Sequence, residues 1–204
     1  MIKFDHFAVS GEDLGSAIAW VEETLGVALQ PGGKHPHFGT HNQLLGLGPF
    51  YLEAIAIDPS APAPDVPRWF NLDNFRGAPR ITNWICAADD LDLVQKTCPI
   101  ELGDVLDLRR DDLRWRFTNP PSGKPAYDGA VPAVIDWLDT PHPSTRLNDV
   151  GCRLRRFVIQ HPQADQIAEF FVPHLDLDWL VIETGVELSF MAQIDTPHGL
   201  RTLQ

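Results

Sequence analysis

Hydrophobic and polar positions along the chain repeat one order of elements: a strand-like run, a helix-like run and further strand-like runs. Residues 2–10 alternate and are rich in Phe, Ile and Val, which is typical of a strand. Apolar residues then recur at helical spacing, at Leu14, Ile18, Val21 and Leu25. We expect Ser10 to cap this helix and Gly26 to end it.

A Pro/Gly/His stretch over residues 31–41 follows and leads into the strands that close the first unit, at 42–47 and 50–57. A Pro-rich connection separates this unit, residues 1–58, from a second one over 81–138. The second unit begins with a strand at 81–87 and a helix that stops before Pro99. Its three further predicted strands are 103–109, 113–118 and 131–138.

A third, degenerate copy occupies residues 150–204. It comprises a strand at 152–160, a helix at 163–172 ended by Pro173, and strands at 178–183, 186–194 and 200–203. The pattern predicts an α+β fold of repeated βαβββ modules, with mostly antiparallel curved sheets around a cleft. Residues 1–140 would form one domain of two modules, with the third module packed on it.

Composition narrows the class of protein. The chain has 204 residues, of which 44% are hydrophobic, and a formal net charge of −12. The excess of acid argues against a nucleic-acid or anionic-membrane partner, since phosphates require a basic face. Three cysteines without a CxxC pair fit a reducing compartment, and no apolar run approaches the about 18 residues of a membrane span. We therefore expect a cytoplasmic globular protein.

Two polar side chains fall on strand faces that should be dry. Period-two alternation places His6 on one face with Phe4 and Ala8, and Glu53 on the apolar face of its own strand. A carboxylate buried there costs several kcal/mol unless it is paired or bound to a metal. A dry carboxylate is also suited to act as a general base. A structural ion pair is the competing interpretation.

The same offsets in the later units select further candidates. Asn83 is the second unit's counterpart of His6, Asp136 is the counterpart of Glu53, and Arg156 is the third unit's equivalent position. Arg156 would bind a substrate carboxylate or neutralise a buried acid.

At these positions the sequence resembles a known family. Asp5-His6, the segment 26–42 (GVALQPGGKHPHFGTHN) and Tyr51-Leu52-Glu53 resemble the glyoxalase-like branch of the vicinal-oxygen-chelate superfamily. The segment 131–137 (VPAVIDW) resembles that branch's second closing strand. The resemblance covers roughly residues 1–140 and implies βαβββ modules whose sheets cup a cleft.

The resemblance also implies a divalent metal held from the first and fourth strands of each module. The implied ligands are His6, Glu53 and Asp136, with Asn83 where a stronger ligand would be expected. This oxygen-rich set suits Mg²⁺, Mn²⁺, Fe²⁺, Ni²⁺ or Zn²⁺, or no metal at all if the set is incomplete.

The histidine-rich loop supplies the remaining candidates. His41 and Asn42 begin a predicted strand, so we expect them to border the cleft and contact substrate, as would Asn83 and Arg156. His35 and His37 are interpreted as residues of a solvent-exposed turn. The paired arginines 109 and 110 are interpreted as a solvated strand face, and His142, beside proline, as a turn residue.

Three functions remain open. The leading hypothesis is a metal-dependent isomerase, lyase or dioxygenase on a small oxygenated metabolite, with Glu53 or Asp136 transferring the proton. The second is a protein that binds a small ligand in the same cleft without metal or catalysis. The third is a scaffold in which the His6–Glu53 pair is structural. The third module would complete a cleft of its own, cover a sheet edge or mediate a homodimer.

Overall fold

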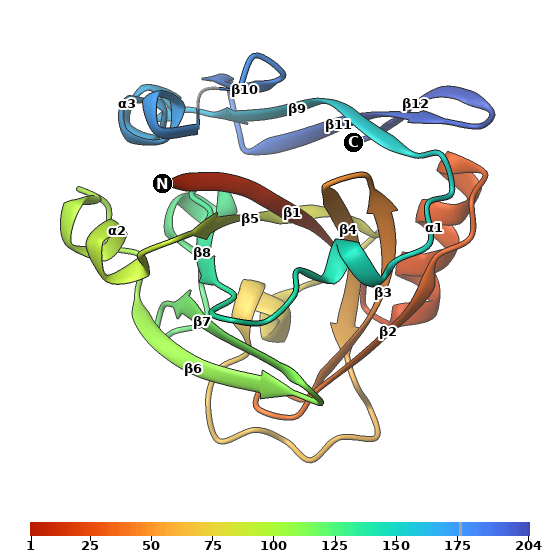
Figure 1. The fold of residues 1–204 in the computed structure, drawn as a ribbon, viewed down its shortest axis with the longest axis horizontal. Coiled ribbons are helices and arrows are strands. Elements are labelled where there is room, and N and C mark those ends of the chain that lie inside the picture. Colours follow the sequence, from red (N-terminus) through yellow and green to blue (C-terminus); the bar gives the residue numbers. More distant parts are fainter. Residues whose placement is uncertain (176) are drawn as a thin grey trace.

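The chain folds as three successive modules of the same element order (Figure 1). A computed structural model describes residues 1–175 and 177–204. The first module comprises β1 (Ile2–Ser10), α1 (Leu14–Leu25), β2 (Gln30–His35), β3 (Thr40–Leu47) and β4 (Phe50–Ile57). The second comprises β5 (Arg80–Ala88), α2 (Leu91–Thr97), β6 (Asp104–Arg110), β7 (Leu113–Asn119) and β8 (Ala133–Asp136). The third comprises β9 (Arg153–His161), α3 (Ala164–Leu175), β10 (Leu180–Thr184), β11 (Ser189–Thr196) and β12 (Gly199–Leu203).

The first two modules share one curled sheet of eight strands, in the order β2-β3-β4-β1-β5-β8-β7-β6. Neighbouring strands are antiparallel except for the β1–β4 and β5–β8 pairs. The third module forms a separate sheet, β10-β9-β11-β12, which lies across the back of the first (Figure 1). The predicted α+β fold with mostly antiparallel curved sheets is confirmed.

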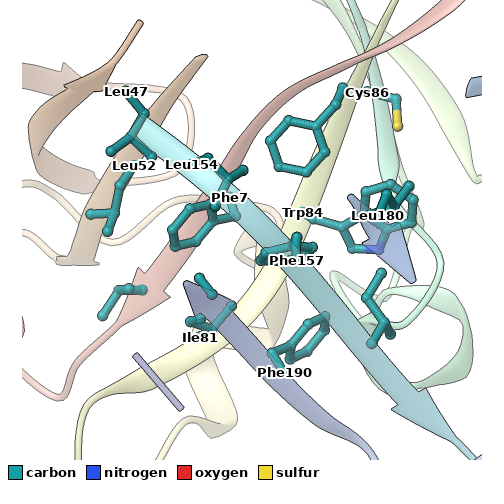
Figure 2. Packing of buried hydrophobic residues seen from close by; sticks show 14 of the residues in the cluster. Phe7, Leu47, Leu52, Ile81, Trp84, Cys86, Leu154, Phe157, Leu180 and Phe190 are labelled. Carbon is teal, nitrogen blue, oxygen red and sulfur yellow. The ribbon is translucent and has the colours of Figure 1, made fainter. Parts of the chain in front are cut away.

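Alternating side chains of the central strands enter two different cores. Phe7 of β1 and Trp84 of β5 point outward, where they meet Phe157 of β9 at ring-centroid distances of 5.2 and 6.4 Å (Figure 2). Ala8 and Ile85 point inward and join a second apolar cluster inside the curl. The third module therefore keeps the outer face of the central strands β1 and β5 dry.

The first helix begins at Leu14, three residues later than it would if Ser10 were its N-cap. Asp13 is the N-cap, and its side chain accepts a hydrogen bond from the Ser16 amide at 2.8 Å. Ser10 belongs to β1 instead, where its hydroxyl is bonded to that of Thr82. The predicted helix end is confirmed, since Gly26 adopts φ 70° and its amide donates to the Glu22 carbonyl.

The third helix continues through Pro173, where an end was expected. A proline removes one amide donor from the last turn. The His174 side chain adds a separate contact in this turn, because its Nδ1 lies 2.6 Å from the Phe170 carbonyl oxygen.

Three short 3-10 helices lie in the connections, at η1 (Trp69–Asn74), η2 (Ala126–Gly129) and η3 (Pro143–Arg146). None of the helices among the described residues is both long and apolar enough to cross a membrane.

Replacing Phe157 by Ala tests whether the third module stabilises the large sheet. Phe157 is fully buried and contacts aromatic rings of both β1 and β5. We expect F157A to lower the free energy of unfolding by about 3–5 kcal/mol, measured by urea denaturation. V186A, at a side chain that is 99% exposed, should change it by less than about 0.5 kcal/mol. Equal effects of the two substitutions would contradict the packing argument.

Candidate functional site

A cleft that opens to solvent lies inside the curl of the large sheet. Its polar lining comes from the first module and from one arginine of the second, namely His6, His35, Asn42, Tyr51, Glu53 and Arg110. Its remaining lining is mainly apolar and aromatic, from Leu44, Trp69, Phe70, Leu113, Trp115, Phe117, Ile135, Trp137 and Pro143. The cleft therefore has a polar side and an apolar side.

A β-bulge sets the orientation of the polar side. The register of β1 against β5 shifts between Phe4 and His6, so that Asp5 is an extra residue in the strand. Phe4 consequently packs in the outer core, while His6 lines the cleft. The expectation that His6 and Phe4 share a face was wrong, because simple alternation does not allow for the bulge.

Asp5 is the centre of the hydrogen-bond network behind the cleft. Its Oδ1 lies 2.5 Å from His6 Nδ1, and its Oδ2 accepts from Trp137 Nε1 at 2.9 Å. His142 Nε2 lies 3.0 Å from the same Oδ2. The Ser144 amide donates to His142 Nδ1 at 3.3 Å, which leaves Nε2 to carry the proton. One carboxylate thus joins β1 to the segment that follows β8.

These contacts keep Asp5 ionised. Burial alone would raise the pKa of its carboxyl, but hydrogen bonds from His142 and His6 and their charges hold it well below its ordinary value. An ionised carboxylate only accepts hydrogen bonds, so His6 must carry a proton on Nδ1. The other ring nitrogen, Nε2, is directed away from Asp5.

His6 Nε2 meets Glu53 inside the cleft, as expected from their positions in the sequence. Nε2 lies 3.7 Å from Glu53 Oε2, which is longer than a hydrogen bond. Asn42 donates from Nδ2 to Glu53 Oε1 at 2.5 Å, and its own Oδ1 accepts from the Gly33 amide at 2.7 Å. This chain of contacts holds Glu53 in place and leaves Oε2 directed toward His6.

Tyr51 fixes the plane of the imidazole. Its ring stacks on that of His6 with a centroid distance of 4.2 Å and an angle of 13°. Burial, together with the charges of Asp5 and Glu53, raises the pKa of Tyr51 well above its usual value. The phenol therefore remains neutral.

His35 and Arg110 close the cleft at the two ends of the curled sheet. Arg110 Nη1 donates to His35 Nε2 at 2.9 Å, and His35 Nδ1 lies 3.1 Å from Thr40 Oγ1. Burial and the charge of Arg110 lower the pKa of His35 to about 3, so its ring is neutral. His35 is buried on strand β2, and its interpretation as an exposed turn residue was wrong; so was the solvated face expected for Arg110.

The second module does not bring its predicted polar residues to this group. Ile85, rather than Asn83, lies opposite His6 in the β1–β5 register. Asn83 pairs with Ala8 and lines a different cavity. Asp136 follows the cleft residue Ile135 on the strand and therefore points to the other face, where its Oδ1 accepts from the Leu138 amide at 2.8 Å.

His41 and Arg156 also lie outside the cleft lining. His41 precedes Asn42 on β3, so that alternation directs its side chain to the opposite face. Arg156 is exposed on β9, in the sheet that covers the back of the large one. Of the predicted substrate-contacting residues, the structure brings Asn42 to the cleft.

The donor set does not fit a metal ion held by the protein alone. His6 and Glu53 provide two ligands, but no group of three His, Cys, Asp or Glu side chains converges anywhere in the described part of the chain. The corresponding inward positions of the second module are Ile85 and Ile135. Divalent ions in proteins are usually held by three or more protein ligands or by carboxylates with substrate phosphates.

Sequence reasoning missed Asp5, His35, Arg110 and His142. Asp5 carries the one available signal, a second polar residue next to His6 in an otherwise apolar strand. The other three meet the site through contacts across 75 to 137 residues of chain, which local patterns do not encode.

Comparison with known proteins identifies the fold. A family model described as a glyoxalase-like domain matches residues 4–175. No curated protein matches the chain. A solved structure of a hypothetical protein from Staphylococcus aureus has 14% sequence identity and a TM-score of 0.59, and covers 100% of this chain and 86% of that one.

Two further solved structures are named for an activity. Methylmalonyl-CoA epimerase from Mycobacterium tuberculosis has 20% identity and a TM-score of 0.44, over 68% of this chain and 89% of that one. A methylmalonyl-CoA epimerase in complex with methylmalonyl-CoA and NH4+ has 13% identity and a TM-score of 0.45, over 70% and 99%.

Replacing Asp5 by Asn tests the buried network. The variant removes the negative charge and replaces one of the two accepting oxygens by an NH2 donor, so that at least one of the three donors loses its acceptor. We expect a loss of about 3 kcal/mol of unfolding free energy at pH 7. The pKa of Asp5 in the folded protein lies below its value in the unfolded chain, which is near 3.9. The stability that ionised Asp5 contributes is therefore complete above the unfolded-state pKa, and it declines as the pH falls toward the folded-state pKa. Urea denaturation at pH 7 and below about pH 4 should therefore show a smaller difference at the lower pH.

D107N is the matched control, because the Asp107 side chain is 91% exposed. It should change stability by less than about 0.5 kcal/mol. A D5N penalty that stays constant with pH would show that folding does not lower the pKa of Asp5.

Proposed function

The chain belongs to the glyoxalase-like domain family, and we propose that its cleft binds a small oxygenated metabolite and transfers a proton within it. The observation that carries the proposal is the convergence of His6 Nε2 and Glu53 Oε2 at 3.7 Å in a cleft that is otherwise largely apolar. Residues 6 and 53 lie on two adjacent parallel strands, so the sheet itself holds them in position.

The two groups have different supports and therefore different roles. Glu53 is held at Oε1 by Asn42, which leaves Oε2 to accept a proton from a carbon next to a carbonyl group. His6 is held at Nδ1 by ionised Asp5, which favours a proton on Nε2 when negative charge develops on the neighbouring substrate oxygen.

Atoms balance in this scheme. The scheme requires His6 to begin with a proton on both ring nitrogens and Glu53 to begin ionised. Glu53 then takes the proton from carbon, and the oxygen of the resulting enediolate receives a hydrogen bond or the Nε2 proton from His6, which takes that proton back when the product forms. Return of a proton to either carbon gives an isomerase, and loss of a group from the intermediate gives a lyase. Asp5 and Asn42 act as positioning residues.

A small-molecule binding protein is the second candidate function. It is favoured by the aromatic side of the cleft, where Trp115 and Phe117 offer contact area but no proton-transfer group. In this case His6 and Glu53 would bind the ligand by hydrogen bonds without changing it.

Replacing Glu53 by Gln, or His6 by Gln, tests the proton transfer. In D₂O, the wild-type protein should exchange the C–H proton next to the carbonyl in members of a panel of small 2-oxo and 2-hydroxy acids and aldehydes, followed by ¹H NMR. We expect each variant to slow this exchange by about 100-fold or more.

H41Q and E187Q are matched controls, since His41 lies outside the cleft lining and Glu187 is exposed. They should exchange at the wild-type rate. Ligand binding without exchange in the wild-type protein would reject catalysis and favour the binding function.

Metal analysis separates this proposal from the metal-dependent one. With two protein ligands in the cleft, we expect protein purified without chelators to hold well below one equivalent of Zn, Ni, Fe, Mn or Mg. We also expect EDTA treatment to leave exchange activity and ligand affinity unchanged. One equivalent of metal in the wild-type protein that is lost in E53Q would overturn the metal-free scheme.

A further inference from the structure

Arg110 is a cation in the cleft without an acidic partner. It ends strand β6, is partly buried and lines the same cavity as His6 and Glu53. Among the described residues no carboxylate oxygen lies within 4.0 Å of its guanidinium, whereas five other arginines, at positions 68, 116, 146, 153 and 155, form such ion pairs. In a chain of net charge −12, a cleft arginine left without an acid suggests that the ligand supplies one.

The present partner of Arg110 is a neutral histidine. Its Nη1 donates to His35 Nε2 at 2.9 Å, and this is the one hydrogen bond of the guanidinium among the described residues. A guanidinium has five N–H donors, so Nε and Nη2 retain donors for a second acceptor. A carboxylate forms stronger, charge-assisted and often bidentate bonds with arginine, and would outcompete imidazole nitrogen.

The Arg110 side chain packs directly against the backbone of strand β2 at Gly33. A Cβ at Gly33 would lie 2.9 Å from Arg110 Cδ and Nε, which is closer than side chains pack. The Gly33 amide also donates to Asn42, which in turn holds Glu53. The same strand therefore positions both the arginine and the proton-accepting carboxylate.

Aromatic side chains occupy the space beside these polar groups. Trp69 lies 4.9 Å from the ring of His35 and 5.4 Å from that of Phe117, and both belong to the cleft lining. Trp115 adds a further face. This surface suits an apolar or aromatic substituent.

We propose that Arg110 binds the carboxylate of the ligand, and that the substrate class is a small 2-oxo or 2-hydroxy acid with an apolar or aromatic substituent. This inference rests on the proposed function for the identity of the reacting carbon, which would lie toward Glu53 and His6. The carboxylate would either displace His35 from Arg110 or bind the guanidinium alongside His35. In the second case Arg110 would contact both the ligand and strand β2 at the other end of the curled sheet.

The test compares phenylpyruvate with its methyl ester, which has nearly the same shape but no charge. We expect isothermal titration calorimetry to show binding of the acid, at least about tenfold weaker binding of the ester, and at least about tenfold weaker binding of the acid to R110M. R109M is the matched control, because Arg109 is exposed and adjacent, and it should bind as the wild type does. Equal affinity for acid and ester, or unchanged binding by R110M, would overturn the inference.

A second measurement uses the wild-type protein and does not depend on folding of the variant. Phenylpyruvate should shift the ¹⁵N–¹H resonance of the Arg110 Nε, and the ester should not. An unchanged resonance at saturating acid would also overturn the inference.

Failure of the inference and failure of the proposed function give different results. Arg110-dependent binding of the acid without C–H exchange would keep the carboxylate subsite and reject proton transfer. Exchange of a 2-oxo acid at equal rates and with equal affinity in wild-type protein and R110M would keep proton transfer and reject the subsite. E53Q should retain binding of the acid, since the two roles are assigned to different residues.

Discussion

The ionised carboxylate of Asp5 is the interaction on which the site depends. It is almost fully shielded from solvent, and an isolated charge in such a place would be very unfavourable. Three donors, from His6, Trp137 and His142, make it favourable, and two of them lie more than 130 residues further along the chain. The same contacts hold the segment after β8 against the cleft and determine which nitrogen of His6 faces the ligand. One group therefore links the packing of two distant chain segments to the geometry of the site.

The third module has a clear physical role in this arrangement. Strands β1, β4 and β5 bury side chains on both faces, so a single curled sheet would leave Phe7 and Trp84 in water. Phe157 and its neighbours on the second sheet cover them. The third module packs on the outer face of these strands, so the concave face remains available to a ligand.

Much of the fold could be predicted because alternation, helical spacing and glycine or proline stops are local signals. The pairing of His6 with Glu53 followed from two polar residues in apolar strands. The transfer of that pattern to Asn83 and Asp136 assumed that the two modules have equal registers. The bulge at Asp5 and the strand alternation at Ile135 place other residues opposite the pair. Arg110 and His35 meet only because the sheet curls, which no local pattern reports.

The two halves of the cleft have consequently diverged in chemistry. The first supplies His6, Glu53 and Asn42, whereas the second supplies mainly aromatic and aliphatic side chains. Apolar walls exclude water and strengthen the charges that remain, which favours proton transfer only if the total charge in the cleft stays balanced. An anionic ligand beside Glu53 would place two negative charges in one dry space. Arg110 is the side chain in the lining with a permanent positive charge, so a contact between Arg110 and the ligand carboxylate would offset this repulsion.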